Sequence, residues 1–150
     1  NKDLLVTDRV YVEDNLKLFN WTINNDIIDI LGYKCQQATC EHRGRKYTAY
    51  FAKEIPVFDG PWKFNGLPGL ILKVASEDKF ISFTAESIKF SINREIKNPF
   101  EGEKLIAFSK YKQEYVKAYN KLLNYRKYGD DGLSYSSRQI SKGGIELYVD

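Results

Sequence analysis

The sequence predicts an α+β fold, in which one curved antiparallel β-sheet is covered by one C-terminal helix. Two observations predict it. Up to about residue 92, short apolar segments alternate with period two and are separated by turn residues, as in successive β-hairpins. Beyond residue 102 the apolar period changes to about 3.6, which indicates a helix. Consecutive hairpins favour an antiparallel meander or half-barrel over a parallel sheet with crossover helices.

The N-terminal part is expected to contain strands over residues 4–12 and 16–23. Asn24-Asn25-Asp26 is a cluster of turn residues and should close a hairpin. The chain would then return as one long strand over residues 27–42. Gly32 lies within that strand and is a candidate β-bulge.

The next hairpins follow from the same alternation. Arg43-Gly44-Arg45 is predicted as a tight turn, because glycine accepts the positive φ that such turns require. A strand over residues 46–53 follows it. After the central segment, a short apolar strand at 70–75 should turn at 76–79 into a long strand over residues 80–92.

The C-terminal part is expected to contain a helix over about residues 109–127, with Gly129 as its stop signal. Its apolar face should cover one face of the sheet and consists of Phe108, Tyr111, Tyr115, Tyr119, Leu122 and Leu123. The other face is rich in lysine and is a candidate docking surface. Residues 145–149 could add an edge strand.

The rest of the chain is organised around the segment Ile55–Leu72, which holds three of the four prolines. Pro56 and Pro61 lack backbone donors, so residues 55–64 cannot lie inside a sheet. Leu67-Pro68-Gly69-Leu70 has the composition of a type II turn.

Four large apolar side chains in this segment are candidate ligand-binding residues: Phe58, Trp62, Phe64 and Leu67. A loop with this composition is too apolar to stay in water. It must either pack against the sheet as a structural plug or form a hydrophobic lip that binds a ligand. The sequence leaves both readings open.

Length and composition bound the class of protein. The 150 residues, of which 43% are hydrophobic, suit a single domain over residues 1–150. A net charge of +3 is too small to imply a nucleic-acid partner. No apolar run reaches the length of a transmembrane segment. The chain contains no methionine, even at position 1, which fits a product from which a signal peptide was removed.

Cys40 and His42 are two residues apart, so on a strand they share a face. Such a pair can form a thiolate nucleophile or two ligands of a copper or zinc site. Cys35 has the opposite parity and would join them only through a bulge, while Glu41 or a partner chain could supply another ligand. Two cysteines five residues apart on one extended strand are too far apart to form a disulfide, so free thiols are expected.

The sequence contains no candidate catalytic residue. The chain has no G-x-S-x-G elbow, no P-loop and no G-x-G-x-x-G motif, and no cofactor is expected. Its carboxylates lie mostly at predicted turns, where a glycosidase-like pair is neither shown nor excluded. Enzymatic activity is therefore not predicted, and a hydrolase ranks third among the functions considered.

Gly66-Leu67-Pro68-Gly69-Leu70-Ile71 resembles the signature of the GLPGLI family. Further fragments match that family's pattern in the same order and extend the likeness over about residues 20–75: Trp21-Thr22-Ile23, Gly32-Tyr33-Lys34-Cys35, Gly44-Arg45-Lys46-Tyr47, Ile55-Pro56 and Gly60-Pro61-Trp62. The family is known from Bacteroidetes-type bacteria, and its members resemble exported envelope proteins. The resemblance implies a periplasmic or envelope-associated location and no particular activity.

These observations favour a non-catalytic envelope protein that uses an aromatic-rich loop on a curved sheet. Its expected partner is an apolar or peptide-like ligand, or an outer-membrane or other envelope protein. Lipoprotein-carrier-like half-barrels share this architecture, which is a comparison of folds alone. The alternative is a metal-handling protein that uses Cys40 and His42.

Overall fold

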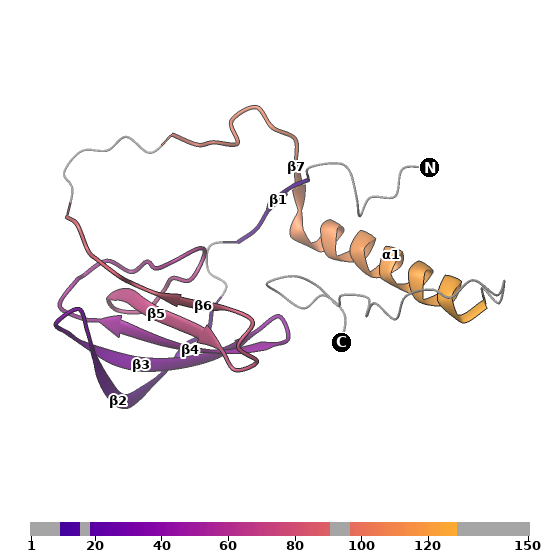
Figure 1. Cartoon of the computed structure of the whole chain (residues 1–150). Helices are drawn as coiled ribbons and strands as arrows, with labels where there is room; N and C mark the ends of the chain where they lie inside the picture. Colours follow the sequence, from indigo (N-terminus) through magenta and orange to yellow (C-terminus); the bar gives the residue numbers. More distant parts are fainter. Residues whose placement is uncertain (1–9, 16–18, 91–96, 129–150) are drawn as a thin grey trace. The chain divides into compact units, whose positions relative to one another are not determined.

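The structure is a computed structural model and describes residues 10–15, 19–90 and 97–128 (Figure 1). The chain divides into two compact units, one formed by Asn15–Ile96 and the other by the two ends of the chain. The first contains a five-stranded antiparallel sheet. The second contains a two-stranded sheet and one helix, so the predicted α+β class is confirmed. A single domain with the helix packed on the five-stranded sheet stays a prediction.

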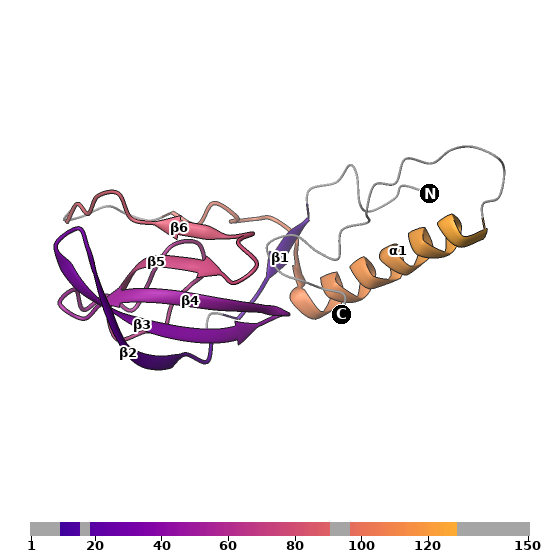
Figure 2. The ribbon, with the colours of Figure 1, turned by 60° about the horizontal axis from the view of Figure 1, so that its bottom comes forward.

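The five-stranded sheet is an open antiparallel meander with the strand order β2-β3-β4-β5-β6, as Figure 2 shows. Its strands are β2 (Thr22–Ile30), β3 (Tyr33–His42), β4 (Arg45–Ala52), β5 (Leu70–Ser76) and β6 (Ser82–Thr84). The predicted strands at 46–53 and 70–75 agree with β4 and β5. The predicted turn at Arg43-Gly44 is also confirmed, because both residues have positive φ angles of 47° and 75°.

In the first hairpin, the residues predicted to form the turn form the bulge, and the chain turns at the glycine that was predicted to be the bulge. Strand β2 runs through Asn24-Asn25-Asp26, and the pairing register with β3 shifts between Ile23 and Ile27, which makes this segment the bulge. The chain reverses instead at Leu31 and Gly32, which have φ angles of 54° and 83°. Side-chain bonds explain the bulge, because Asn24 Nδ2 donates to Gln37 Oε1 over 2.8 Å.

Two further strand predictions need correction. Residues 19–21 precede β2 and are not a strand, and the predicted residues 16–18 lie outside the described ranges. In the predicted strand at 80–92, the described residues form only the three-residue β6, and residues 85–90 are irregular. Residues 91 and 92 lie outside the described ranges. Phe90 is 73% exposed, so its alternation with polar neighbours did not reflect a buried face.

The second unit pairs β1 (Tyr11–Glu13) in parallel with β7 (Leu105–Ala107). Helix α1 (Phe108–Tyr128) follows β7 directly and confirms the helix predicted over 109–127. No described helix is both long and apolar enough to span a membrane. Most of the predicted strand at 4–12, Gly129 and the predicted strand at 145–149 lie outside the described residues.

Apolar clusters lie on both faces of the five-stranded sheet. One face carries the alternating residues Tyr47, Ala49 and Phe51 of β4, which form the larger cluster with neighbours that include Phe64 and Leu67. Ala52 has the opposite parity and belongs to the smaller cluster, which consists of Ile30, Cys35, Ala52, Ile55 and Leu72. The sheet is therefore buried on both sides near one end of its strands.

Candidate functional site

The central loop (residues 53–69) joins β4 to β5 and is held along its length by main-chain hydrogen bonds. Its amides and carbonyls pair within the loop and with the start of β5, through Leu70 N to Ile55 O at 3.0 Å, Ile71 N to Asp59 O at 3.0 Å and Gly66 N to Phe58 O at 3.1 Å. The indole Nε1 of Trp21 donates to Asn65 O over 2.8 Å from another part of the unit. The loop is therefore a fixed part of the sheet structure.

The end of the loop turns differently from the prediction. Gly69 N donates to Leu67 O over 2.8 Å, so Pro68 is the central residue of a γ-turn and not part of a type II turn. Gly69 has a φ of 154°, and a Cβ at this position would lie 2.3 Å from the carbonyl oxygen of Ala52. Only glycine allows the loop to approach β4 this closely.

The four candidate ligand-binding residues of this loop separate into two pairs. Phe64 and Leu67 are 0% and 1% exposed and belong to the larger core cluster. The Phe64 ring lies 5.1 Å from that of Tyr47 and 4.9 Å from that of Phe19. These two residues are therefore the structural plug that the sequence allowed for, and they are unavailable to a ligand.

Phe58 and Trp62 remain exposed, by 65% and 46% of their surface. Trp62 has a φ of 55°, a left-handed conformation that is uncommon for a bulky residue and that the surrounding loop must hold in place. Its ring lies 5.4 Å from that of the buried Phe64, and Lys63 Nζ lies 4.6 Å above it. The loop thus presents two aromatic side chains on an anchored backbone.

An apolar groove of about 390 Å³ lies between the central loop, β5 and the segment that begins at β6. Its apolar walls come from Pro61, Leu70, Ile71, Leu72, Phe83, Ala85 and Ile88. Its volume falls in the range of small-molecule binding sites. Sequence reasoning missed this groove, because residues 83–89 were assigned to a regular strand, whereas only an irregular segment beside β5 leaves the space open.

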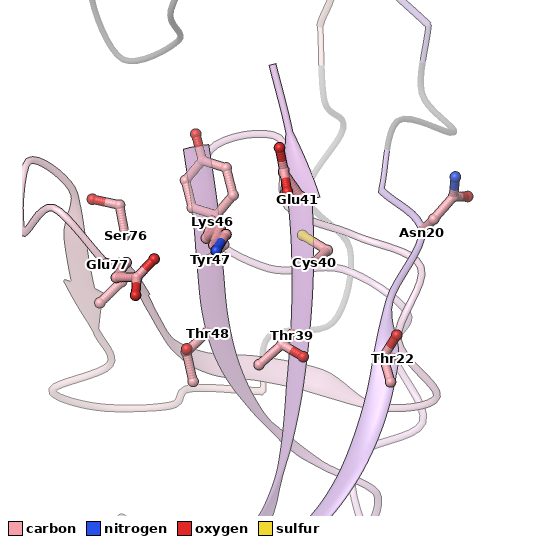
Figure 3. A pocket seen from close by; sticks show the side chains of 11 residues that line it. Asn20, Thr22, Thr39, Cys40, Glu41, Lys46, Tyr47, Thr48, Ser76 and Glu77 are labelled. Atoms are coloured by element: carbon pink, nitrogen blue, oxygen red, sulfur yellow. The ribbon is translucent and has the colours of Figure 1, made fainter. Parts of the chain in front are cut away.

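A second hollow of about 480 Å³ lies over the end of the sheet where β3 turns into β4 (Figure 3). Thr22, Thr39 and Thr48 form one row across its floor, because they pair in register across β2, β3 and β4. Glu41 and Lys46 also line it and face each other in register. The lining of this hollow is mixed, because Cys40 and Tyr47 lie beside the threonines and beside charged side chains of both signs.

The metal-ligand prediction gains no support from the geometry. Cys35 belongs to the smaller cluster and Cys40 to the larger one, so they lie on opposite faces of the sheet. Both are buried free thiols, as expected. Burial raises the pKa of Cys40 to about 12, which disfavours the thiolate that a metal binds. The ring of His42 lies 4.7 Å from that of Phe19. The described residues contain no group of three or more potential metal ligands.

The basic turn between β3 and β4 is partly structural. Arg45 is only 6% exposed, and its guanidinium pairs with the carboxylate of Asp78 on the turn between β5 and β6. It also lies 4.4 Å above the ring of Phe80. Arg45 therefore joins two turns of the sheet.

Comparison with known proteins finds one similarity. Residues 41–73 are similar to a family described as proteins of unknown function (Porph_ging). This stretch runs from the end of β3 through the central loop into β5, and it includes residues 66–71. No curated protein and no solved structure shows a significant match. The resemblance to the GLPGLI family stays an expectation.

Proposed function

We propose that this protein is an exported, periplasmic or envelope-associated binding module without a catalytic role. Its site is the apolar groove together with Phe58 and Trp62, which do not line the groove but lie within two residues of its lining residues Gly60 and Pro61 in the sequence. Its ligand is an apolar or peptide-like molecule. The observation that carries the proposal is the anchoring of the central loop. Its main chain is fixed by hydrogen bonds, while Phe58 is 65% and Trp62 46% exposed.

Rigid presentation of aromatic groups favours binding, because little conformational entropy is lost when a ligand arrives. Exposed aromatic side chains also supply large apolar contact areas and are enriched at binding hot spots. The groove adds an apolar concavity that is continuous with the loop, since Gly60 and Pro61 line it. The resemblance to exported envelope proteins supports the proposed location.

Titration with N-phenylnaphthylamine, an uncharged dye that fluoresces in apolar surroundings, tests the groove. The wild type should give a saturable increase in fluorescence. Ser87→Trp places an indole in the groove and should abolish most of it, because Ser87 is an exposed lining residue. Ser82→Trp is the matched control, since Ser82 is an exposed serine of β6 that does not line the groove.

The role of the lip is tested separately with Phe58→Ala and Trp62→Ala, each of which should weaken dye binding about three- to tenfold. Ile27→Ala is the control, because Ile27 is 59% exposed and lies on the edge strand β2. Circular dichroism verifies that each variant is folded. The proposal is wrong if the wild type binds no dye, or if Ser87→Trp and Ser82→Trp bind it equally.

A further inference from the structure

The polar groups of the apolar groove have a common property. Of the described residues that line it, only Lys89 is charged, and the side chains of Thr84 and Ser87 carry hydroxyl groups. All three can donate a hydrogen bond. Glu86 is adjacent in sequence but does not line the groove. The groove therefore combines apolar walls with one cation and two hydroxyl donors, a set that complements an anion attached to an apolar body.

We infer that the ligand of this groove is a single-tailed carboxylic acid of the fatty-acid type, with its carboxylate near Lys89 and its hydrocarbon tail against the half-buried Leu70, Phe83 and Ile88. This inference rests on the proposed function, because it specifies the ligand of the same site. It follows from charge complementarity, since the lining cation has no lining carboxylate to neutralise it among the described residues.

The same walls argue against a peptide. An extended peptide brings an amide and a carbonyl with every residue, and each loses water on entering an apolar groove. The amide of Ala85 is already used, because it donates to Leu72 O over 2.7 Å. An alkyl chain has no such groups to satisfy. The apolar part of the groove therefore fits a hydrocarbon tail better than a peptide backbone.

The experiment measures displacement of N-phenylnaphthylamine from the full chain at neutral pH and low salt. The competitors are laurate, methyl laurate and dodecylamine, which have hydrocarbon chains of similar length and differ in the charge of the headgroup. Laurate should displace the dye at a concentration about three- to tenfold lower than methyl laurate, and dodecylamine should be the weakest. Added salt should reduce the advantage of laurate, because Lys89 is exposed to solvent.

Lys89→Glu should remove the preference for laurate while leaving displacement by methyl laurate unchanged. Lys53→Glu is the control, because Lys53 is an exposed lysine of the same unit that does not line the groove. If laurate and its ester displace the dye equally, or if the preference survives Lys89→Glu, the inference about the headgroup is wrong and the proposed function stands.

Two other outcomes separate the proposals. In the first, the dye binds the wild type and not Ser87→Trp, but none of the three competitors displaces it. The groove is then a binding site, but not one for single-tailed amphiphiles. Displacement by an acetylated apolar tripeptide in that case would assign the groove to peptides and overturn the inference. If the dye itself does not bind, the proposed function fails and the inference fails with it.

Discussion

The indole Nε1 of Trp21 donates a hydrogen bond to the main-chain carbonyl of Asn65, over a distance of 2.8 Å and a separation of 44 residues. This bond joins the segment before β2 to the central loop. The ring of Trp21 also stacks on that of Phe19 at 5.5 Å. The loop is thus held from outside its own hairpin as well as by its own main chain.

Trp21→Phe should lower the free energy of unfolding by about 1–2 kcal/mol, because the partly buried carbonyl of Asn65 loses its donor while a ring remains in place. Urea denaturation measures the change. Trp62→Phe is the control and should change stability by less than about 0.5 kcal/mol, since Trp62 is half exposed. Equal effects of the two substitutions would show that the hydrogen bond contributes nothing.

Gly69→Ala should destabilise the fold by about 2–4 kcal/mol, because its Cβ would lie 2.3 Å from the carbonyl oxygen of Ala52. Gly66→Ala separates steric overlap from backbone strain. Gly66 also has a positive φ, of 88°, but a Cβ there meets nothing within 4 Å, so a loss of about 1 kcal/mol is expected. Thermal unfolding of both variants tests the difference, and a smaller loss for Gly69→Ala than for Gly66→Ala would contradict it.

Asp78→Asn should lower stability by about 1–2 kcal/mol, because it removes the negative charge of the carboxylate that pairs with the buried guanidinium of Arg45. The loss is moderated because the Asp78 side chain is 49% exposed. Asp29→Asn removes a comparable pair between exposed side chains, Asp29 and Lys34, and should leave the unfolding midpoint unchanged. A similar loss for both variants would mean that the burial of Arg45 is unimportant.

The buried thiol of Cys40 should make the fold sensitive to alkali. Its pKa is about 12 in the folded chain, against an ordinary value of 9.0. The unfolded chain therefore releases this proton first, and stability falls as the pH rises from about 9 towards 12, by up to about 1.4 kcal/mol per pH unit. Cys40→Ala should lose stability at every pH but show a shallower alkaline decline. Denaturation curves from neutral pH to about pH 11 measure both slopes, and parallel slopes would refute the assignment.

Leu31→Asn should stabilise the hairpin of β2 and β3 by about 0.5–1 kcal/mol. Leu31 has a φ of 54° and is 45% exposed, so it loses little packing, and Asn-Gly is the preferred pair for a turn in which both φ angles are positive. Leu31→Ala is the control and should not stabilise, because alanine has no preference for this conformation. Urea denaturation compares the two variants.

In the first hairpin, local composition did not predict which residues form the turn and which form the bulge. Asn24-Asn25-Asp26 has the composition of a turn, but the same polar side chains also stabilise a bulge when a partner strand faces them. That partner includes Gln36, whose Nε2 donates to Asn24 O over 2.6 Å. Local composition could not distinguish the two outcomes, because the deciding bonds come from the neighbouring strand.

The predicted site could be identified only in part for a related reason. The sequence indicated that the aromatic central segment either packs against the sheet or forms a hydrophobic lip, and the structure buries Phe64 and Leu67 while Phe58 and Trp62 stay exposed. The sequence could not separate Phe64 from Phe58, because two phenylalanine side chains in one loop have the same affinity for an apolar environment. Which of them is buried depends on the position of Phe19 and Tyr47, which surround Phe64 from distant parts of the chain.

The sequence alone therefore determined the α+β class, the meander of strands, the alternating faces of β4 and the helix that follows, because periodicity and turn residues act over a few neighbours. The tertiary structure decided where the first hairpin turns, how short β6 is, and which loop residues stay exposed. It alone formed the apolar groove, since Pro61, Ile71 and Ile88 line one space only after β5 pairs with β6. Contacts between distant residues have no local signature, and the groove depends on them.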